Sequence, residues 1–241
     1  MKVRLNKFIS QAGVASRREA DRLISEGRVQ INKRIVDELG SKIDDEKDVV
    51  YVDGRKVQPP ERHHYLVLNK PPGYLVTLKD PFKRRTIRDL LPAAMGRVFP
   101  VGRLDLDSQG LLLLTDDGEL AYRLSHPRFQ VKKVYVAKVQ GLPSPEALAR
   151  LERGVYLDGK KTAPAKVSVL AQGPKSSVLR IEIHEGRKRE VRSMCQAAGH
   201  NVLELKRIGY GGLELRNLKP GEWRPLEPRE VHRLRELVNL S

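Results

Sequence analysis

Four consecutive leucines, at positions 111–114, constrain the fold of this chain more than any other stretch. They follow Gly110 and end in Thr-Asp-Asp-Gly, a sequence typical of a tight turn. A short apolar run of this kind indicates a strand in the protein interior. Another apolar run ends at Val101, and the residues between the two runs are mostly polar or glycine. The pattern therefore predicts a short loop, containing Asp105, that is held between two buried elements.

Asp105 is the best candidate for a reactive group, because a carboxylate fixed in this loop beside Arg103 is placed to act as a nucleophile or a base. The alternative is that Asp105 and Asp107 are ordinary solvated acids. The chain has no Walker A loop, no dinucleotide-binding glycine pattern and no serine nucleophile elbow. Its single cysteine, Cys195, falls on an apolar helical face and is expected in the core. These observations favour a carboxylate over other nucleophiles.

The composition points to a polyanionic partner. The formal net charge is +16 and the pI is about 10.1, which favours nucleic acid first and an anionic membrane surface second. No apolar run approaches the roughly 20 residues that span a bilayer, and the N-terminus does not read as a signal peptide. One cysteine excludes an internal disulfide, and the adjacent His63 and His64 are expected to point to opposite faces of a strand. We expect a cytoplasmic protein that uses no metal.

Charge and prolines divide the chain in two. Residues 1–36 hold nine Lys and Arg against three acids, whereas residues 37–62 carry a net charge of −3. Pro59 and Pro60 then break any regular ladder and mark a linker. We expect one small domain over residues 1–60 and a larger one over residues 61–241.

Two short helices are predicted in the small domain. The first ends at Gly13, and Ser16 begins the second with a capping box that uses Glu19. Basic residues at the polar positions of this segment could together bind a phosphate backbone. They are Lys7, Arg17, Arg18, Arg22, Arg28, Lys33 and Arg34. The alternative is that they form a solvated face.

Two features of the larger domain suit the handling of a nucleotide. Tyr135 lies on an alternating strand predicted over residues 132–139, and it is the leading candidate for stacking on a nucleobase. Residues 79–88 form a basic segment that includes Arg84 and Arg85. This segment would grip a polyanionic substrate or would merely be solvated.

A second basic cluster lies within residues 185–199, for which the spacing of apolar residues predicts a helix. Arg187, Lys188, Arg189 and Arg192 are expected in its first turns. Cations at that end oppose the helix dipole, an arrangement that a bound anion would relieve. The alternative is that the long side chains extend into water.

The first 60 residues resemble the RNA-binding domain named for ribosomal protein S4. The resemblance is carried by residues 4–24 and by Gly-Arg-Val-Gln-Ile-Asn-Lys at 27–33. It implies a small fold that grips structured RNA with basic helices.

Five motifs of the larger domain resemble, in the same order, those of the ribosomal pseudouridine synthases of the RsuA/RluB type. They are Lys-Pro-Pro-Gly at 70–73, the stretch at 102–118, Lys-Val-Tyr-Val at 133–136, Glu-Gly-Arg-Lys-Arg-Glu-Val-Arg at 185–192, and Leu-Lys-Pro-Gly-Glu-Trp-Arg at 218–224. The resemblance implies an α+β protein. A small S4-like α/β RNA-binding domain would precede a catalytic domain built on a mixed, mostly antiparallel sheet, and no cofactor or metal is implied.

The family's catalytic roles would fall on three residues. Asp105 would be the catalytic aspartate, acting at C1′ of a flipped uridine as a nucleophile or as the base and electrostatic partner of a glycal route. Tyr135 would stack on the uracil. Arg192 would pair with Asp105 and orient it, while Asp107 is expected to be structural.

The same resemblance implies contacts to the RNA. Arg103 would hold the flipped nucleotide or fill its place, and Arg187 and Arg189 would contact phosphates. Ser193 departs from the family, which often has a basic residue there, so one RNA contact is in doubt.

The target implied is a uridine of ribosomal RNA, either free or in a pre-ribosomal particle. Residues 190–200 and 223–226 are closer to the large-subunit branch, which favours 23S over 16S rRNA. The protein is expected to act as a monomer. Two other classes remain: a non-catalytic RNA-binding assembly factor and a DNA-binding regulator.

Overall fold

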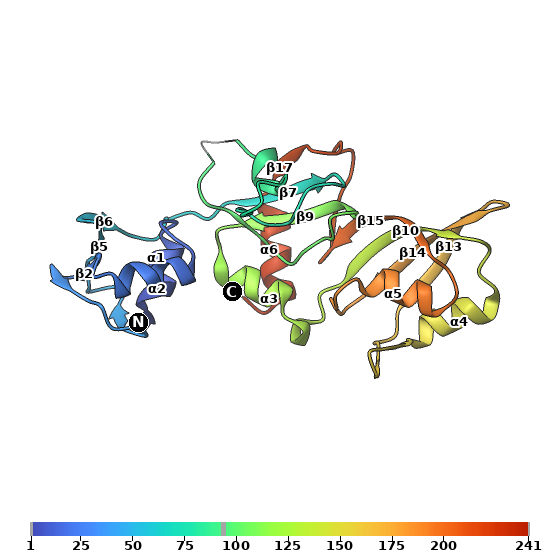
Figure 1. The fold of residues 1–241 in the computed structure, drawn as a ribbon, viewed down its shortest axis with the longest axis horizontal. Helices are drawn as coiled ribbons and strands as arrows, with labels where there is room; N and C mark the ends of the chain where they lie inside the picture. The colour runs from blue at the N-terminus through green and yellow to red at the C-terminus, as the bar shows by residue number, and fades with distance from the viewer. Residues whose placement is uncertain (1, 93–94, 241) are drawn as a thin grey trace. The chain divides into compact units, whose positions relative to one another are not determined.

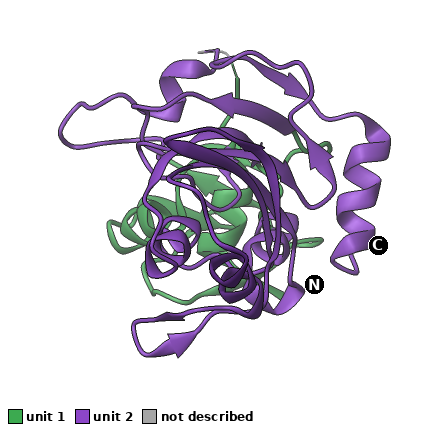
Figure 2. Ribbon diagram, turned by 90° about the vertical axis from the view of Figure 1, so that its right-hand side faces the viewer, with its two compact units in different colours: residues 1–64, 93–98, 116–118 green, residues 65–92, 99–115, 119–241 purple. Residues whose placement is uncertain are grey.

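The structure is a computed structural model that describes residues 2–92 and 95–240. The chain forms two compact units, coloured separately in Figure 2. Unit 1 comprises residues 1–64, 93–98 and 116–118, and unit 2 comprises the rest. Each unit is described by itself. None of the described helices is long and apolar enough to cross a membrane.

Unit 1 packs two helices against short strands (Figure 1). Its elements are β1 (Lys2–Arg4), α1 (Leu5–Gln11), α2 (Arg17–Ser25), β2 (Val29–Ile31), β3 (Arg34–Ile35), β4 (Lys42–Asp44), β5 (Val50–Val52) and β6 (Arg55–Val57). The strands pair antiparallel in the order β3-β2-β5-β6, and β1 pairs with β4. As predicted, Ser16 caps α2, and its hydroxyl accepts a hydrogen bond from the Glu19 amide at 3.2 Å.

Unit 2 is built on one large sheet. Its strands are β7 (Tyr65–Lys70), β8 (Phe99–Pro100), β9 (Gln109–Thr115), β10 (Lys133–Gln140), β13 (Lys166–Gln172), β14 (Ser176–Ile183), β15 (Val202–Tyr210), β16 (Leu213–Glu214) and β17 (Trp223–Pro225). The main order is β13-β14-β10-β15-β9-β7-β17, with β16 beside β15 and β8 beside β9. Every described pairing in this sheet is antiparallel except β15 with β9. The predicted α+β class with a mixed, mostly antiparallel sheet is confirmed.

Helices cover this sheet in two groups (Figure 1). The helices are α3 (Gly118–Ser125), α4 (Pro145–Arg153), α5 (Glu190–Ala197) and α6 (Pro228–Leu237), with short 3-10 turns at Ile87–Leu90 and Pro127–Phe129. Helices α3 and α6 share a core with β7, β9 and β15, while α4 and α5 lie by the other half of the sheet (Figure 1). A small hairpin, β11 (Tyr156–Leu157) and β12 (Lys160–Lys161), follows α4.

The leucine run forms a buried strand of the sheet, as predicted. Leu111 to Leu114 lie in β9 between β7 and β15 and are fully buried on both faces. Gly110, at the start of β9, has φ +110° and lies against the backbone of Arg207 in β15. Together these contacts fix the strand that follows the Asp105 loop.

Three predictions about local structure are wrong. Helix α5 begins at Glu190, after Arg189 in a left-handed conformation, so Arg187 and Lys188 precede the helix. The pattern at residues 202–205 predicts a strand that ends at Leu205, but β15 continues to Tyr210, because its second half pairs with β10, β9 and β16. His63 and His64 precede β7 and do not point apart, since their Nδ1 atoms lie 3.0 and 2.7 Å from the two carboxylate oxygens of Asp116.

Candidate active site

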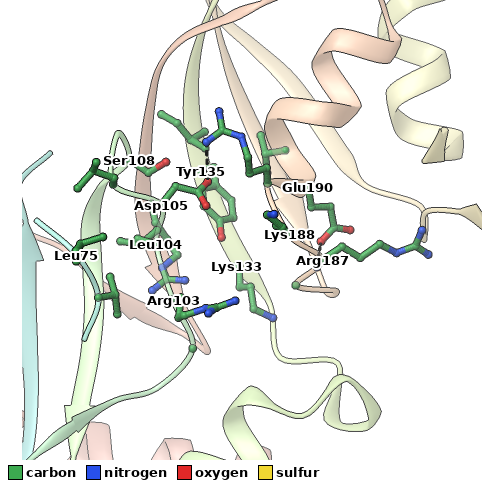
Figure 3. A pocket seen from close by; sticks show the side chains of 18 of the residues that line it. Leu75, Arg103, Leu104, Asp105, Ser108, Lys133, Tyr135, Arg187, Lys188 and Glu190 are labelled. Carbon is green, nitrogen blue, oxygen red and sulfur yellow. Dashed lines mark hydrogen bonds and ion pairs between the residues drawn. The ribbon is translucent and has the colours of Figure 1, made fainter. Parts of the chain in front are cut away.

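Unit 2 contains a cavity of about 640 Å³, lined by the loop before β9, by β10 and β15, by the segment before α5, and by residues between β7 and β8. Asp105, Tyr135 and Arg103 all line it (Figure 3). Arg84, Arg187 and Arg189 line it as well, whereas Arg85 and Arg192 do not. The structure thus brings most of the predicted residues of the larger domain to one place.

The loop that carries Asp105 is held in place by the side chain of a buried lysine, Lys70. The Lys70 ammonium donates hydrogen bonds to the carbonyl oxygens of Pro71, Asp105 and Ser108 at 3.0, 3.1 and 2.8 Å. Burial lowers the pKa of Lys70 to about 8, although the charges of Asp107 and Asp105 oppose this shift. An ammonium on several carbonyls holds the loop in one conformation. In the sequence Lys70 is marked only as the first residue of the Lys-Pro-Pro-Gly motif, which does not indicate this role.

The Asp105 carboxylate projects from this loop and is 33 % exposed. Its nearest cation is Arg189, with Nη1 at 3.7 Å from Oδ2. Arg189 also reaches Asp107, at 3.4 Å. The Asp105 carboxylate is therefore accessible from the cavity and lies beside a positive charge.

Arg192 does not pair with Asp105, which corrects the prediction. Its guanidinium is 10 % exposed and lies 3.2 Å from the Asp107 carboxylate. It also donates to the carbonyl oxygens of Asp107 and Val202, at 3.3 and 3.1 Å. Because these contacts tie the guanidinium to β15 and to Asp107, it anchors α5 to the loop, and Asp105 is left to Arg189.

Tyr135 forms a nearly buried wall of the cavity. It lies on β10 in register with Arg207 of β15 and Ile181 of β14. The ring therefore sits on a rigid sheet, which suits it to hold a flat base.

Two buried cations, on the paired strands β10 and β15, were not singled out from the sequence. Arg207 is 1 % exposed, donates from Nε to the Leu111 carbonyl at 2.7 Å, and has a buried Nη2 without a partner. Lys133 donates to the Val131 carbonyl at 2.9 Å, and burial together with the charge of Arg207 lowers its pKa to about 8. Both line the cavity and add positively charged hydrogen-bond donors to its wall. Lys-Val-Tyr at 133–135 was the sequence signal for Lys133, whereas nothing marked Arg207.

A buried acid organises the segment before α5. The Glu190 carboxylate accepts a hydrogen bond from the Arg187 amide at 3.0 Å, and burial with the neighbouring Glu185 raises the pKa of Glu190 to about 7. The Arg187 guanidinium donates to the carbonyl oxygens of Lys160 and Lys161, at 3.0 and 2.7 Å. Much of its donor capacity is therefore used within the protein.

The remaining basic residues predicted to contact RNA differ in whether they already have a partner within the protein. Arg103 is exposed and has no acidic partner among the described residues. Arg84 forms an ion pair with Asp80 at 2.6 Å, and the Arg85 guanidinium lies over the Tyr74 ring at 5.9 Å. Arg103 is thus the freest of these cations to meet an anion.

In unit 1 the predicted basic residues form two groups. Arg28 makes a two-armed ion pair with Asp53, at 2.7 and 2.8 Å, and Arg22 pairs with Glu19 at 2.7 Å. The exposed residues for which the described structure holds no acidic partner are Arg17, Arg18, Lys33 and Arg34. Lys7 is half-buried.

No group of three or more His, Cys, Asp and Glu residues that could hold a metal ion occurs in the described parts of the chain.

Comparisons with known proteins agree with this architecture. Residues 64–197 match the family model for RNA pseudouridylate synthase, and residues 3–50 match the S4 domain. Ribosomal large subunit pseudouridine synthase B of Bacillus subtilis is 47 % identical over 238 residues, which cover 98 % of this chain and 97 % of that protein. An RNA pseudouridine synthase of Aquifex aeolicus is 46 % identical over 242 residues, covering 100 % and 97 %. A crystal structure of a pseudouridylate synthase superposes with a TM-score of 0.71 at 32 % identity, over 96 % of this chain and 99 % of that one. This chain is therefore a member of the RNA pseudouridine synthase family of isomerases, with an S4 domain at its N-terminal end.

Proposed function

We propose that this enzyme converts a uridine of 23S ribosomal RNA to pseudouridine and that Asp105 is the carboxylate that acts on the ribose. The observation that carries the proposal is the Asp105 loop. Its carbonyl oxygens are held by a buried Lys70, while the Asp105 carboxylate itself is open to the cavity. The choice of 23S rRNA is supported by the relatives in Bacillus subtilis and Vibrio cholerae, both named ribosomal large subunit pseudouridine synthase B.

The chemistry requires a uridine outside the base stack. Flipping the nucleotide costs a few kcal/mol and exposes its ribose to the enzyme. A cavity of about 640 Å³ admits such a nucleotide, and Tyr135 offers the ring against which uracil would stack. Arg103, exposed at the same cavity, would contact a phosphate or fill the gap that the uridine leaves.

The reaction then exchanges one glycosidic bond for another. The bond between N1 and C1′ breaks, the uracil turns within the cavity, and C5 bonds to C1′. The proton on C5 is released and N1 takes up a proton, so the product is an isomer of the substrate. Asp105 would act on the ribose, at C1′ as a nucleophile or at C2′ as a base. Arg189, 3.7 Å away, supplies the neighbouring positive charge.

Replacing Asp105 tests this proposal. We expect Asp105→Asn to lower the rate of pseudouridine formation by more than about 1,000-fold, since removing a reacting group has effects of this size. The RNA dissociation constant should stay within about two-fold, because the side chain keeps its shape. The measurement is pseudouridine mapping in 23S and 16S transcripts, together with equilibrium binding.

Asp107→Asn is the matched control, because it removes a charge from the same loop. It should retain measurable activity, since Asp107 pairs with Arg192 and Arg189 and is not among the residues that line the cavity. An Asp105→Asn variant that works at the wild-type rate would refute the catalytic assignment. Product in 16S and not in 23S transcripts would refute the target. Comparing free rRNA with pre-ribosomal particles identifies the form that the enzyme accepts.

A further inference from the structure

The segment between β7 and β8 displays an aromatic ring on a rigid turn. The Asp80 carboxylate accepts hydrogen bonds from the amides of Phe82 and Arg84, both at 3.1 Å. The Arg84 guanidinium closes the turn on the same carboxylate at 2.6 Å, and these bonds lower the pKa of Asp80 to about 2. Lys83 adopts a left-handed conformation, with φ +53°. The turn is therefore held by its own side chains.

Phe82 stands at the tip of this turn and is 77 % exposed. Its ring meets the Arg84 guanidinium, whose central carbon lies 5.2 Å from the ring centre. A phenyl group so exposed gains little from folding, since burial is what makes an aromatic side chain stabilising. Its ring is therefore available to a partner outside the chain.

The surroundings of Phe82 select RNA over a protein partner. Residues 79–85 hold four basic residues, Lys79, Lys83, Arg84 and Arg85, and their one acid, Asp80, is already paired with Arg84. Lys79, Asp80 and Arg84, on both sides of Phe82 in the chain, line the cavity that contains Asp105. Exposed aromatics among basic side chains are the usual platform for unpaired bases.

We propose that Phe82 stacks on an unpaired base of the RNA next to the target uridine. When the uridine leaves the stack, its neighbour loses one stacking partner, and the phenyl ring replaces it. The inference rests on the proposed function, because it requires RNA as the substrate at this cavity. It adds a binding subsite outside the cavity, formed by one aromatic ring and its basic neighbours.

Substitutions at Phe82 in the full-length protein test this subsite. The probes are 23S and 16S rRNA transcripts, and the readouts are Kd and its dependence on salt. Phe82→Leu keeps an apolar side chain but loses the aromatic face, so Kd should rise about ten-fold. Phe82→Tyr keeps the face and should bind like the wild type. The slope of log Kd against log salt should be the same for all three proteins, because no phosphate contact is removed.

Lys83→Gln is the matched control at the next residue. It should reduce the salt slope, in contrast to Phe82→Leu. All variants should keep the wild-type unfolding temperature, since both side chains are exposed. Equal Kd values for Phe82→Leu and wild type would overturn the stacking proposal and favour a protein partner. A change in slope with Phe82→Leu would also overturn it, because the substitution would then have disturbed a phosphate contact.

A failure of the proposed function would be seen in a different measurement. Its failure would appear as an absence of pseudouridine in transcripts treated with the wild-type enzyme. The comparison of Phe82 variants uses binding alone, so it can be interpreted in either case.

Discussion

At the scale of residues, two arginines three positions apart both reach Asp107, but only the first also reaches Asp105. Arg189 precedes α5 in a left-handed conformation and reaches both Asp105 and Asp107. Arg192, inside the helix, is directed to Asp107 and to the backbone of β15. The first arginine is 45 % exposed and can shift when a substrate arrives, whereas the second holds the loop in place.

Glu190 makes stability depend on pH. Its folded-state pKa of about 7 lies above the value of 4.5 for an exposed glutamate. The native state therefore binds this proton more tightly than the unfolded chain. The stability that results is fully present below pH 4.5 and is lost as the pH rises through 7. We expect the unfolding temperature of Glu190→Gln, relative to wild type, to be higher at pH 8 than at pH 5.

Thermal unfolding at the two pH values measures this difference. The amide keeps an oxygen that can accept from the Arg187 amide, so the comparison isolates the charge. A difference between variant and wild type that is the same at pH 5 and pH 8 would show that Glu190 stays ionised in the folded protein.

Residues differ in how well their roles could be predicted. Asp105 and Tyr135, whose roles stay predictions, were recognisable as candidates because their local patterns, a polar loop between apolar runs and an alternating strand, are present in the fold. Lys70, Lys133 and Arg207 were not, because a buried cation and an exposed one look alike in a sequence. What buries these three is a sheet assembled from distant strands. The partner of Arg192 was expected from the family resemblance alone, and no local pattern indicates that its guanidinium lies at the Asp107 carboxylate and the Val202 carbonyl.

At the scale of elements, the parallel contact of β9 with β15 organises unit 2. It joins Gln109 and Gly110 to Lys206 and Arg207, next to the Asp105 loop. The sequence predicted β9 well but ended β15 too early, because residues 206–210 are strand by pairing with β9, β10 and β16, two of which lie far away in the chain. Local patterns cannot report a partner that lies about 97 positions away, as the pair at 110 and 207 does.

Gly110 is the residue on which this contact depends. A Cβ at this position would lie 2.2 Å from the carbonyl oxygen of Arg207, and φ is +110°. Both backbones would have to move, so we expect Gly110→Ala to lower the free energy of unfolding by about 3 kcal/mol or more. Urea titration followed by the fluorescence of Trp223, the chain's single tryptophan, measures the change in unit 2.

Gly186→Ala is the control for this substitution. A Cβ there meets nothing closer than 3.8 Å, and its φ is not in the left-handed region. It should change the free energy of unfolding by less than about 1 kcal/mol. Similar losses for the two alanine variants would mean that the close approach of β9 and β15 does not limit stability.

At the scale of the whole molecule, a net charge of +16 predicts strong and salt-sensitive attraction to RNA. The structure shows that these charges are not equivalent. In unit 1, Arg22 and Arg28 are neutralised by Glu19 and Asp53. Sequence alone counted them as part of one basic surface, because ion pairs between distant positions such as 28 and 53 arise only on folding.

The salt dependence of RNA binding should therefore come from the unpaired cations of unit 1. Each phosphate contact adds roughly 0.7 to 0.9 to the slope of log Kd against log salt, because counterions are released from the RNA. Arg17 and Arg18 are exposed and have no acidic partner among the described residues. We expect the double variant Arg17→Gln, Arg18→Gln to lower the slope by about 1 to 2.

Removing the Arg28 pair, as Arg28→Gln with Asp53→Asn, keeps the net charge and should leave the slope unchanged. Titration of an rRNA transcript at several salt concentrations gives all three slopes. If the Arg17 and Arg18 variant keeps the wild-type slope, the phosphates are bound elsewhere and the basic face of α2 is only solvated.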